Sequence, residues 1–113
     1  MHIDSYDFGH IVIDGSSYRQ DLLIWPGNIK SDWWRRESHL LQVDDLAEAL
    51  VAAPAVLVVG MGNPGRMQVD QTLTAFLKDK GIELVAVPTK EACRLINALT
   101  GKRRLAAALH LTC

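Results

Sequence analysis

The chain has 113 residues, of which 49% are hydrophobic and 22% are charged. A chain of this length forms about one domain, and this composition is typical of a folded globular protein rather than a disordered one. The net charge of −1 creates no strong field, so neither nucleic acid nor an anionic membrane is an expected partner. We therefore predict a single domain over residues 1–113.

Cysteine content and the start of the chain bear on where the protein works. Its two cysteines, Cys93 and Cys113, are too few for a disulfide framework, and no cysteine or histidine spacing predicts a metal site. The first residues lack the apolar stretch of a signal peptide, and no apolar run approaches the ~20 residues that span a bilayer. These features predict a cytoplasmic protein without a metal or a cofactor.

The first thirty residues have the pattern of an antiparallel β-meander. Ile11–Ile13 leads into the pair Asp14-Gly15, which favours a tight hairpin. Leu22–Trp25 follows as another strand and is closed by turn residues. From Val43 the apolar residues change to helical spacing, which predicts a helix with acidic residues in its first turn.

The second half alternates strands and helices. The continuous apolar runs Ala55–Gly60 and Ile82–Val87 predict strands that are covered on both faces. Apolar residues from Val69 onward predict a helix between these strands, and Thr89 is expected to cap the next helix. A strand–helix–strand unit is almost always parallel and right-handed, so the loops after the two strands should meet at one edge of the sheet. Ligands of open α/β sheets bind at that edge.

A glycine-rich loop lies at this predicted edge. Gly60, Gly62 and Gly65 have the GxGxxG spacing of dinucleotide-binding loops. However, Pro64 removes one amide donor, and the helical pattern begins only some residues later. The second strand also ends without an acid that would hold a ribose. A dinucleotide site is therefore disfavoured, and a βα turn without any ligand remains an equal alternative to a binding site.

The leading hypothesis is a non-catalytic binding or assembly-type module with a cleft between the Gly60–Gly65 loop and the start of the helix at Thr89. The glycines would present backbone donors to a small anion or a peptide, and Thr89 would contact it. The second half of the chain has four acids and eight bases, which favours an anion there. The remaining predicted ligand-binding residues are Arg66, Lys90, Arg94 and Asn97.

Cys93 suggests an alternative, a small enzyme with a cysteine nucleophile. It is expected near the start of a helix with Lys90 and Arg94 close by, and both the dipole and the cations favour a thiolate. A base such as His39 or His110 would have to approach through folding. The structural interpretation, a small buried hydrophobic residue, is favoured over catalysis.

A second alternative rests on the most unusual run in the chain. Trp33, Trp34, Arg35 and Arg36 combine the residue types that are enriched where proteins bind one another. An interaction module would expose both tryptophans. The structural interpretation is a rigid loop that packs one tryptophan under the sheet and pairs the arginines with the abundant acidic residues. The partner would be an unknown protein, and the chain itself a monomer or a weak homodimer.

Several segments together resemble a known family of small uncharacterised domains. They are WWRRESHLLQVDDL, VLVVGMGNPGRMQV, GIELVAVPTKEACRLIN, GKRR and the ending AALHLTC. The family's animal members are called adipogenesis-associated, and mitochondrial relatives are assembly factors for NADH dehydrogenase, respiratory complex I. Met61 and Ile96 stand where the family usually has hydroxyl-bearing residues.

The resemblance implies a fold but no established reaction, cofactor or catalytic residue. It implies a three-layer α/β domain with a mixed central sheet, flanking helices and an added N-terminal antiparallel β layer. It also implies that Arg104–Leu111 forms a strand, although the alanines of this segment favour a helix.

Overall fold

The apolar runs of the second half form the centre of the fold. The computed structural model describes residues 1–113. Its strands are β1 (Ile3–Asp7), β2 (His10–Ile13), β3 (Ser16–Tyr18), β4 (Leu22–Trp25), β5 (Asn28–Lys30), β6 (Leu40–Leu41), β7 (Val56–Gly60), β8 (Gln68–Val69), β9 (Glu83–Val87) and β10 (Leu105–Leu109). Its helices are a 3₁₀ turn η1 (Val43–Leu46), α1 (Ala47–Val51), α2 (Gln71–Asp79) and α3 (Thr89–Leu99).

The central sheet is mixed and has the strand order β5-β4-β10-β7-β9. β7 pairs in parallel with both β9 and β10, and β10 pairs antiparallel with β4. The predicted parallel crossover between β7 and β9 is thus confirmed. The last strand, β10, lies in the middle of the sheet. The family resemblance implied that this segment is a strand, whereas its alanines favour a helix.

Alternation along β7 and β10 sends side chains to two separate cores, because successive residues of a strand face opposite sides of a sheet. Val56 and Val58 belong to one core with Leu105 and Leu109, and Leu57 belongs to the other. Every residue of β7 and β10 is buried. Continuous apolar runs are the sequence signature of such doubly covered strands.

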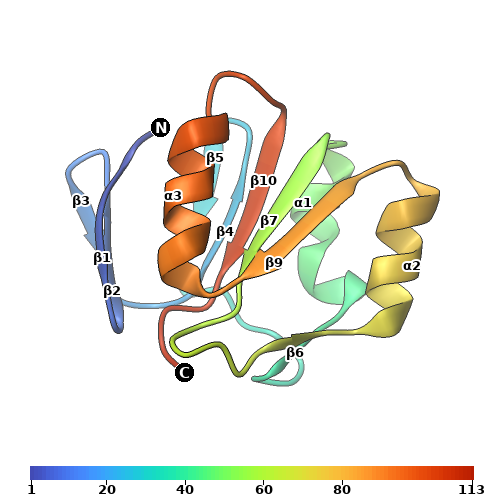
Figure 1. Ribbon diagram of the computed structural model, residues 1–113, viewed down its shortest axis with the longest axis horizontal. Coiled ribbons are helices and arrows are strands. Elements are labelled where there is room, and N and C mark those ends of the chain that lie inside the picture. The colour runs from blue at the N-terminus through green and yellow to red at the C-terminus, as the bar shows by residue number, and fades with distance from the viewer.

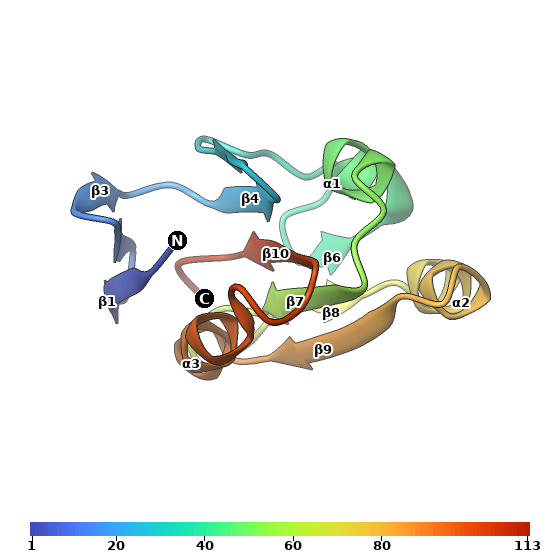
Figure 2. The same cartoon turned by 90° about the horizontal axis from the view of Figure 1, so that it is seen from above.

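Three layers result, and Figure 2 shows them from above. α1 and α2 cover one face of the central sheet, while α3 and the separate three-stranded sheet β1-β2-β3 lie on the other (Figures 1 and 2). The predicted α/β fold with a mixed sheet and an added β layer is confirmed. The first thirty residues are divided, however, because the β4–β5 hairpin joins the central sheet rather than the added layer. No helix is both long and apolar enough to cross a membrane.

Asn97 attaches the added β layer to α3. Its side-chain amide donates to the Ile3 carbonyl at 2.9 Å, and its side-chain oxygen accepts from the Ile3 amide at 2.8 Å. One side chain therefore pairs with both backbone groups of a strand residue, as a neighbouring strand would. Asn97 serves the fold here rather than the predicted ligand cleft.

Two sequence-based details of helix α2 and helix α3 were wrong. Val69 was expected in the helix but lies in β8, and α2 begins after Asp70, whose carboxylate accepts from the Thr72 amide as an N-cap. Thr89 was expected as the N-cap of α3, but Pro88 occupies that position. The Thr89 hydroxyl is used elsewhere, at the glycine loop.

We predict that Asn97→Ala loosens the β1 attachment, because both backbone groups of Ile3 lose their partner. The free energy of unfolding should fall by about 1–3 kcal/mol. Amide exchange at Ile3 should quicken more than at residues of the central sheet. Asn28→Ala is the matched control, since the side-chain amide of Asn28 is exposed and donates only to the nearby Pro26 carbonyl. Equal stability of the two variants would contradict the role of Asn97 in attaching β1 to α3.

Candidate functional site

The loop after β7 is folded back onto its neighbours. The Met61 amide donates to the Val87 carbonyl at 2.9 Å, and the Met67 amide donates to the Met61 carbonyl at 3.0 Å. The Gly62 amide donates to Thr89 Oγ1 at 2.8 Å, and the Gly62 carbonyl accepts from the Thr89 amide at 3.1 Å. The ends of β7 and β9 meet, as the parallel crossover predicted, but these loop amides are already used.

The segment after β10 holds the other side of the same loop. The Asn63 amide donates to the Thr112 carbonyl at 2.9 Å, and the Arg66 amide donates to the Cys113 carbonyl at 3.2 Å. Pro64 has no amide proton to offer. The backbone donors that the glycine pattern was expected to present to a ligand are therefore largely bonded to the chain itself.

Close packing explains why glycine stands at two positions of this loop. Gly62 has a φ of +102°, and a Cβ there would lie 2.8 Å from His110 Cδ2 and still closer to the Thr112 carbonyl. A Cβ on Gly60 would lie 2.9 Å from Thr89 Oγ1. Both glycines are needed for the fold, so a bulky residue at position 62 would disturb packing as well as any ligand.

Thr89 is fully buried and connects the loop, α3 and the end of β10. Its hydroxyl accepts from the Gly62 amide and donates to the His110 carbonyl at 2.6 Å. Both hydrogen-bonding functions of the hydroxyl are thereby engaged. The predicted contact between Thr89 and a ligand would require one of these bonds to break.

The basic residues of the predicted cleft are dispersed. Arg66 and Lys90 are exposed beside the loop, whereas Arg94 lies a turn further along α3 and pairs with Glu91 at 3.3 Å. An anion or peptide site formed by Gly60–Gly65, Arg66, Lys90 and Arg94 stays a prediction. Binding there requires the loop to release its internal hydrogen bonds.

A buried charged cluster, which the sequence analysis missed, lies beside the loop at the same end of the sheet. Asp21 Oδ2 accepts from Arg35 Nη1 at 2.8 Å and lies 2.8 Å from His110 Nδ1. Asp21 Oδ1 accepts from the Leu111 amide at 2.8 Å. The side chain of Asp21 is 17% exposed, that of Arg35 is 5% exposed, and that of His110 is 7% exposed. These partners are 14, 89 and 90 residues away in sequence, so no local spacing signals them.

The protonation of this cluster follows from its geometry. Burial alone would raise the pKa of Asp21, but hydrogen bonds from His110, the Leu111 amide and Arg35 outweigh it and hold the pKa below the usual 3.8. Because an ionised carboxylate lies beside it, His110 Nδ1 carries a hydrogen and donates a hydrogen bond to Asp21 Oδ2. The 3.2 Å approach of Arg35 Nη2 to the same nitrogen then joins two donors and is not a hydrogen bond.

The far nitrogen of His110, Nε2, is buried and has no hydrogen-bond partner. An aspartate that orients a histidine in this way is part of catalytic triads, where Nε2 accepts the proton of a nucleophile. Here His39 packs edge-on against the His110 ring, with centroids 5.7 Å apart, and no hydroxyl or thiol is bonded to Nε2. The cluster can hold three segments of the chain together, but as arranged it activates no nucleophile.

The tryptophan–arginine run is half buried and half exposed. Trp33 is 4% exposed, and its indole N–H donates to the Asp45 carbonyl at 3.0 Å, while Arg35 lies over its ring at 5.0 Å and is fixed by the charged cluster. Trp34 is 81% exposed, and the Arg36 side chain is 69% exposed. The expectation of an interaction module, that both rings are exposed, was wrong. One packed tryptophan, with both arginines paired to acidic residues, fits the structural interpretation of this run.

The structure contradicts the environment expected for a Cys93 nucleophile. Cys93 is 7% exposed and packs in the core between α3 and the central sheet. Burial raises the pKa of its thiol to about 12, the opposite of the lowering that the helix start and nearby cations were expected to cause. Cys93 is a small core residue, which was the favoured interpretation.

A hollow of about 560 Å³ opens at the opposite end of the central sheet. Its wall comes from the β4–β5 turn, the α3–β10 turn and the N-terminal hairpin. The lining residues are Met1, Asp14, Ile24, Trp25, Pro26, Gly27, Asn28, Ile29, Thr100, Gly101, Arg103, Arg104 and Leu105. The sequence analysis did not predict this hollow. The run of three basic residues at 102–104, next to a turn, is the local feature that could have indicated it.

A family model described as protein of unknown function (DUF498/DUF598) matches residues 3–110. The chain belongs to this family. The conserved hypothetical protein PH1505 from Pyrococcus horikoshii OT3 has a solved structure with 33% identity and a TM-score of 0.87, and the match covers 100% of both chains. A structure named MT938 is 24% identical, with a TM-score of 0.81 over 99% of this chain and 98% of that one.

A third similar structure is that of the Rpa2829 protein from Rhodopseudomonas palustris. It is 27% identical, with a TM-score of 0.76 over 95% of this chain and 80% of that chain. These similarities agree with the α/β fold described above. They attach no reaction or ligand to the DUF498/DUF598 domain, so its function has to be argued from its own surface.

Asp21 should make the stability of the domain pH-dependent. Because its pKa is lower in the folded state, the ionised carboxylate stabilises the fold above the unfolded pKa of 3.8, and this contribution is lost as pH falls through the folded pKa. We predict that Asp21→Asn is less stable than the wild type at neutral pH and that the difference shrinks below about pH 4. Urea unfolding at a series of pH values measures this difference in the free energy of unfolding.

The control for this prediction is Asp44→Asn, because the Asp44 side chain is 81% exposed and makes one long contact with Arg36. Its stability should follow the wild type at every pH. A stability difference between Asp21→Asn and the wild type that is constant from neutral to acidic pH would contradict the ionised, charge-paired state of Asp21.

Cys93 should alkylate far more slowly in the folded protein than in the unfolded chain. Its burial and raised pKa leave almost no accessible thiolate near neutral pH. Iodoacetamide labelling followed by peptide mass spectrometry measures both thiols at once. Cys113, which is partly exposed, is the internal comparison. Labelling of Cys93 at the rate of Cys113 would restore the nucleophile hypothesis.

Proposed function

We propose that this domain is a non-catalytic binding module of the assembly type that holds a partner protein through Trp34. The observation that carries the proposal is the 81% exposure of this large aromatic side chain. Tryptophan and arginine are the residues most enriched at the energetic centres of protein interfaces. Trp34 has Arg36 as an exposed neighbour on the same loop.

The loop that carries Trp34 is held on both sides. Trp33 packs into the core next to α1 and donates to Asp45, and Arg35 is bonded to Asp21 and twice to the Ser38 carbonyl, at 3.0 and 2.8 Å. A side chain on such a loop loses little freedom when it binds. Preorganisation of this kind increases affinity without adding contacts.

Asp45 extends this support to the next element. Its carboxylate accepts from the Arg36 amide at 3.0 Å and from the Gln42 amide at 2.8 Å, at the start of η1. The indole N–H of Trp34 donates to Asp32 at 3.0 Å, which orients the exposed ring. The ring is therefore exposed in one defined orientation.

The resemblance to assembly factors of NADH dehydrogenase supports the same class of function. That relation, like the adipogenesis-associated name, is part of the proposal. A protein partner is also consistent with the balanced net charge of −1, which gives no general attraction to nucleic acid. The partner surface should offer an apolar pocket for the indole ring and an acidic group for Arg36.

Trp34→Ala should abolish partner capture while the domain stays folded. Loss of a central tryptophan costs about 2 kcal/mol or more, which is roughly a thirtyfold loss of affinity. The measurement is quantitative capture from the cells in which the protein is natively made, with thermal unfolding to confirm the fold. Phe8→Ala is the matched control, because Phe8 is another exposed aromatic residue, at 57%. Equal capture by Trp34→Ala and the wild type would refute the proposal.

A further inference from the structure

The hollow at the amino ends of β7 and β10 is a second feature that could recognise a ligand. It lies where β10 begins at Leu105, at the opposite end of the sheet from the glycine loop. Turns from three parts of the chain surround it: the β2–β3 turn with Asp14, the β4–β5 turn with Gly27, and the α3–β10 turn with Gly101. Its volume of about 560 Å³ is within the range of sites that hold small organic molecules.

The inner wall of the hollow is apolar. Ile24 and Leu105 line it and are 3% and 7% exposed, and both belong to the core between the central sheet and α3. Ile29, which packs against the same core, and Trp25 also line the hollow. The apolar part of a ligand would lie against this wall.

The charged residues of the wall favour an anion. Among the charged side chains that line the hollow, the two arginines, Arg103 and Arg104, outnumber the one acid, Asp14. Asp14 already accepts from the His2 amide at 2.8 Å. Guanidinium groups bind carboxylates through paired, charge-assisted hydrogen bonds.

The two arginines differ in how firmly they are held. Arg104 donates from Nε and Nη2 to the Ala52 carbonyl, at 2.9 and 2.7 Å, so that contact with the end of α1 fixes its position. Arg103 contacts Glu83 only at 3.4 Å, and both side chains are about half exposed, so this pair is weak. Arg103 is thus the arginine that can turn to a ligand at little cost.

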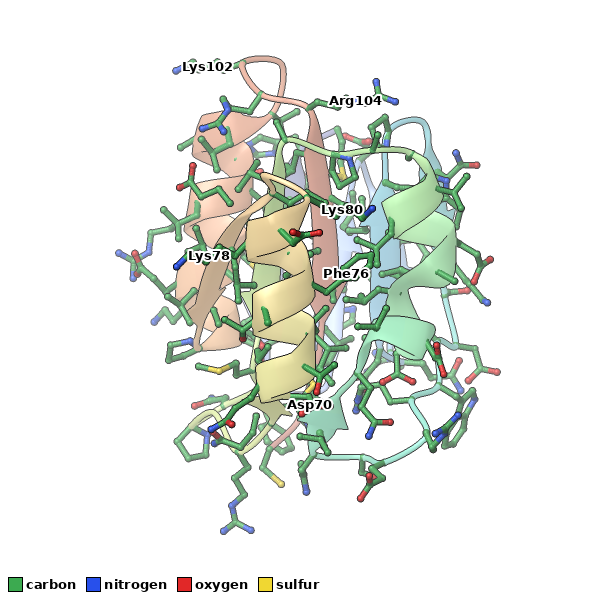
Figure 3. The ribbon with its side chains drawn as sticks, turned by 90° about the vertical axis from the view of Figure 1, so that its right-hand side faces the viewer. Asp70, Phe76, Lys78, Lys80, Lys102 and Arg104 are labelled. Atoms are coloured by element: carbon green, nitrogen blue, oxygen red, sulfur yellow. The ribbon has the colours of Figure 1, made fainter.

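Further cations surround the same end of the molecule. Figure 3 shows Lys102 and Arg104 at the end of the molecule opposite Asp70, with Lys80 lying towards them at the end of α2. Neither lysine lines the hollow, and Glu83 at this end of the molecule pairs with Arg103, so both signs of charge surround the opening.

We propose that the hollow binds a small organic carboxylate, with the apolar body against Ile24, Ile29 and Leu105 and the carboxylate at Arg103. This site is independent of the partner surface around Trp34. A carboxylate can form charge-assisted hydrogen bonds with the guanidinium group of Arg103, whereas a neutral ligand of the same shape cannot.

The experiment titrates the full-length protein with phenylacetate and follows the three indole N–H signals by NMR. Only the Trp25 signal should move in a saturable manner, because Trp25 lines the hollow. The signals of Trp33 and Trp34 are internal controls, since their N–H groups are bonded to Asp45 and Asp32 at other places. Phenylethanol, a neutral molecule of similar shape, tests the need for charge.

Arg103→Gln should weaken phenylacetate binding by about tenfold, as expected for the loss of a charge-assisted hydrogen bond. Arg94→Gln is the matched control, because Arg94 is an exposed arginine of α3 that does not line the hollow, and it should bind as the wild type does. The proposal is overturned if the Trp25 signal does not move, if phenylethanol binds as tightly as phenylacetate, or if both arginine variants weaken binding equally.

Discussion

The arrangement of the carboxyl end of the sheet depends on one buried carboxylate. An ionised group that is removed from water must be compensated by charge and hydrogen bonds, or it destabilises the fold. Asp21 meets this requirement with a side chain from the loop before β6, a side chain from the end of β10 and a backbone amide just beyond it. Since each partner has to be in place, the carboxylate fixes how the N-terminal half, the tryptophan loop and the C-terminal segment meet. The cluster brings specificity of arrangement rather than a large net stabilisation.

Much of the fold follows from patterns that the sequence displays. The apolar run Ala55–Gly60 forms β7, which is buried throughout as predicted. The run Ile82–Val87 was also expected to be buried, but β9 is an edge strand and is only partly buried. The parallel pairing of the two strands follows from the helix between them. Leu105–Leu109 did not follow, because its alanines favour a helix locally and only its position between β4 and β7 makes it a strand. The misplaced start of α2 has a similar cause: Val69 fits the helical period, while Asp70 carries the stronger signal, that of an N-cap.

Less of the candidate site was predictable, because its residues meet through long-range contacts. The meeting of the loops after β7 and β9 was predicted correctly from the crossover rule. No pattern in the sequence predicted that the carbonyls of Thr112 and Cys113 would accept hydrogen bonds from the loop amides of Asn63 and Arg66, which are 49 and 47 residues away. Trp33 and Trp34 were equivalent in sequence, because a loop has no periodicity that would distinguish a buried ring from an exposed one.

These contacts occupy the edge at which open α/β sheets usually bind ligands. Ligands normally bind beyond the carboxyl ends of the parallel strands, where the loops diverge and leave a crevice. Here Thr112 and Cys113 enter that crevice, and Thr89, Gly62 and the residues after β10 satisfy one another's hydrogen bonds. A ligand at the glycine loop would have to compete with these internal hydrogen bonds. The exposed ring of Trp34 and the hollow beside Arg103 carry no such cost, because neither requires the loop to open.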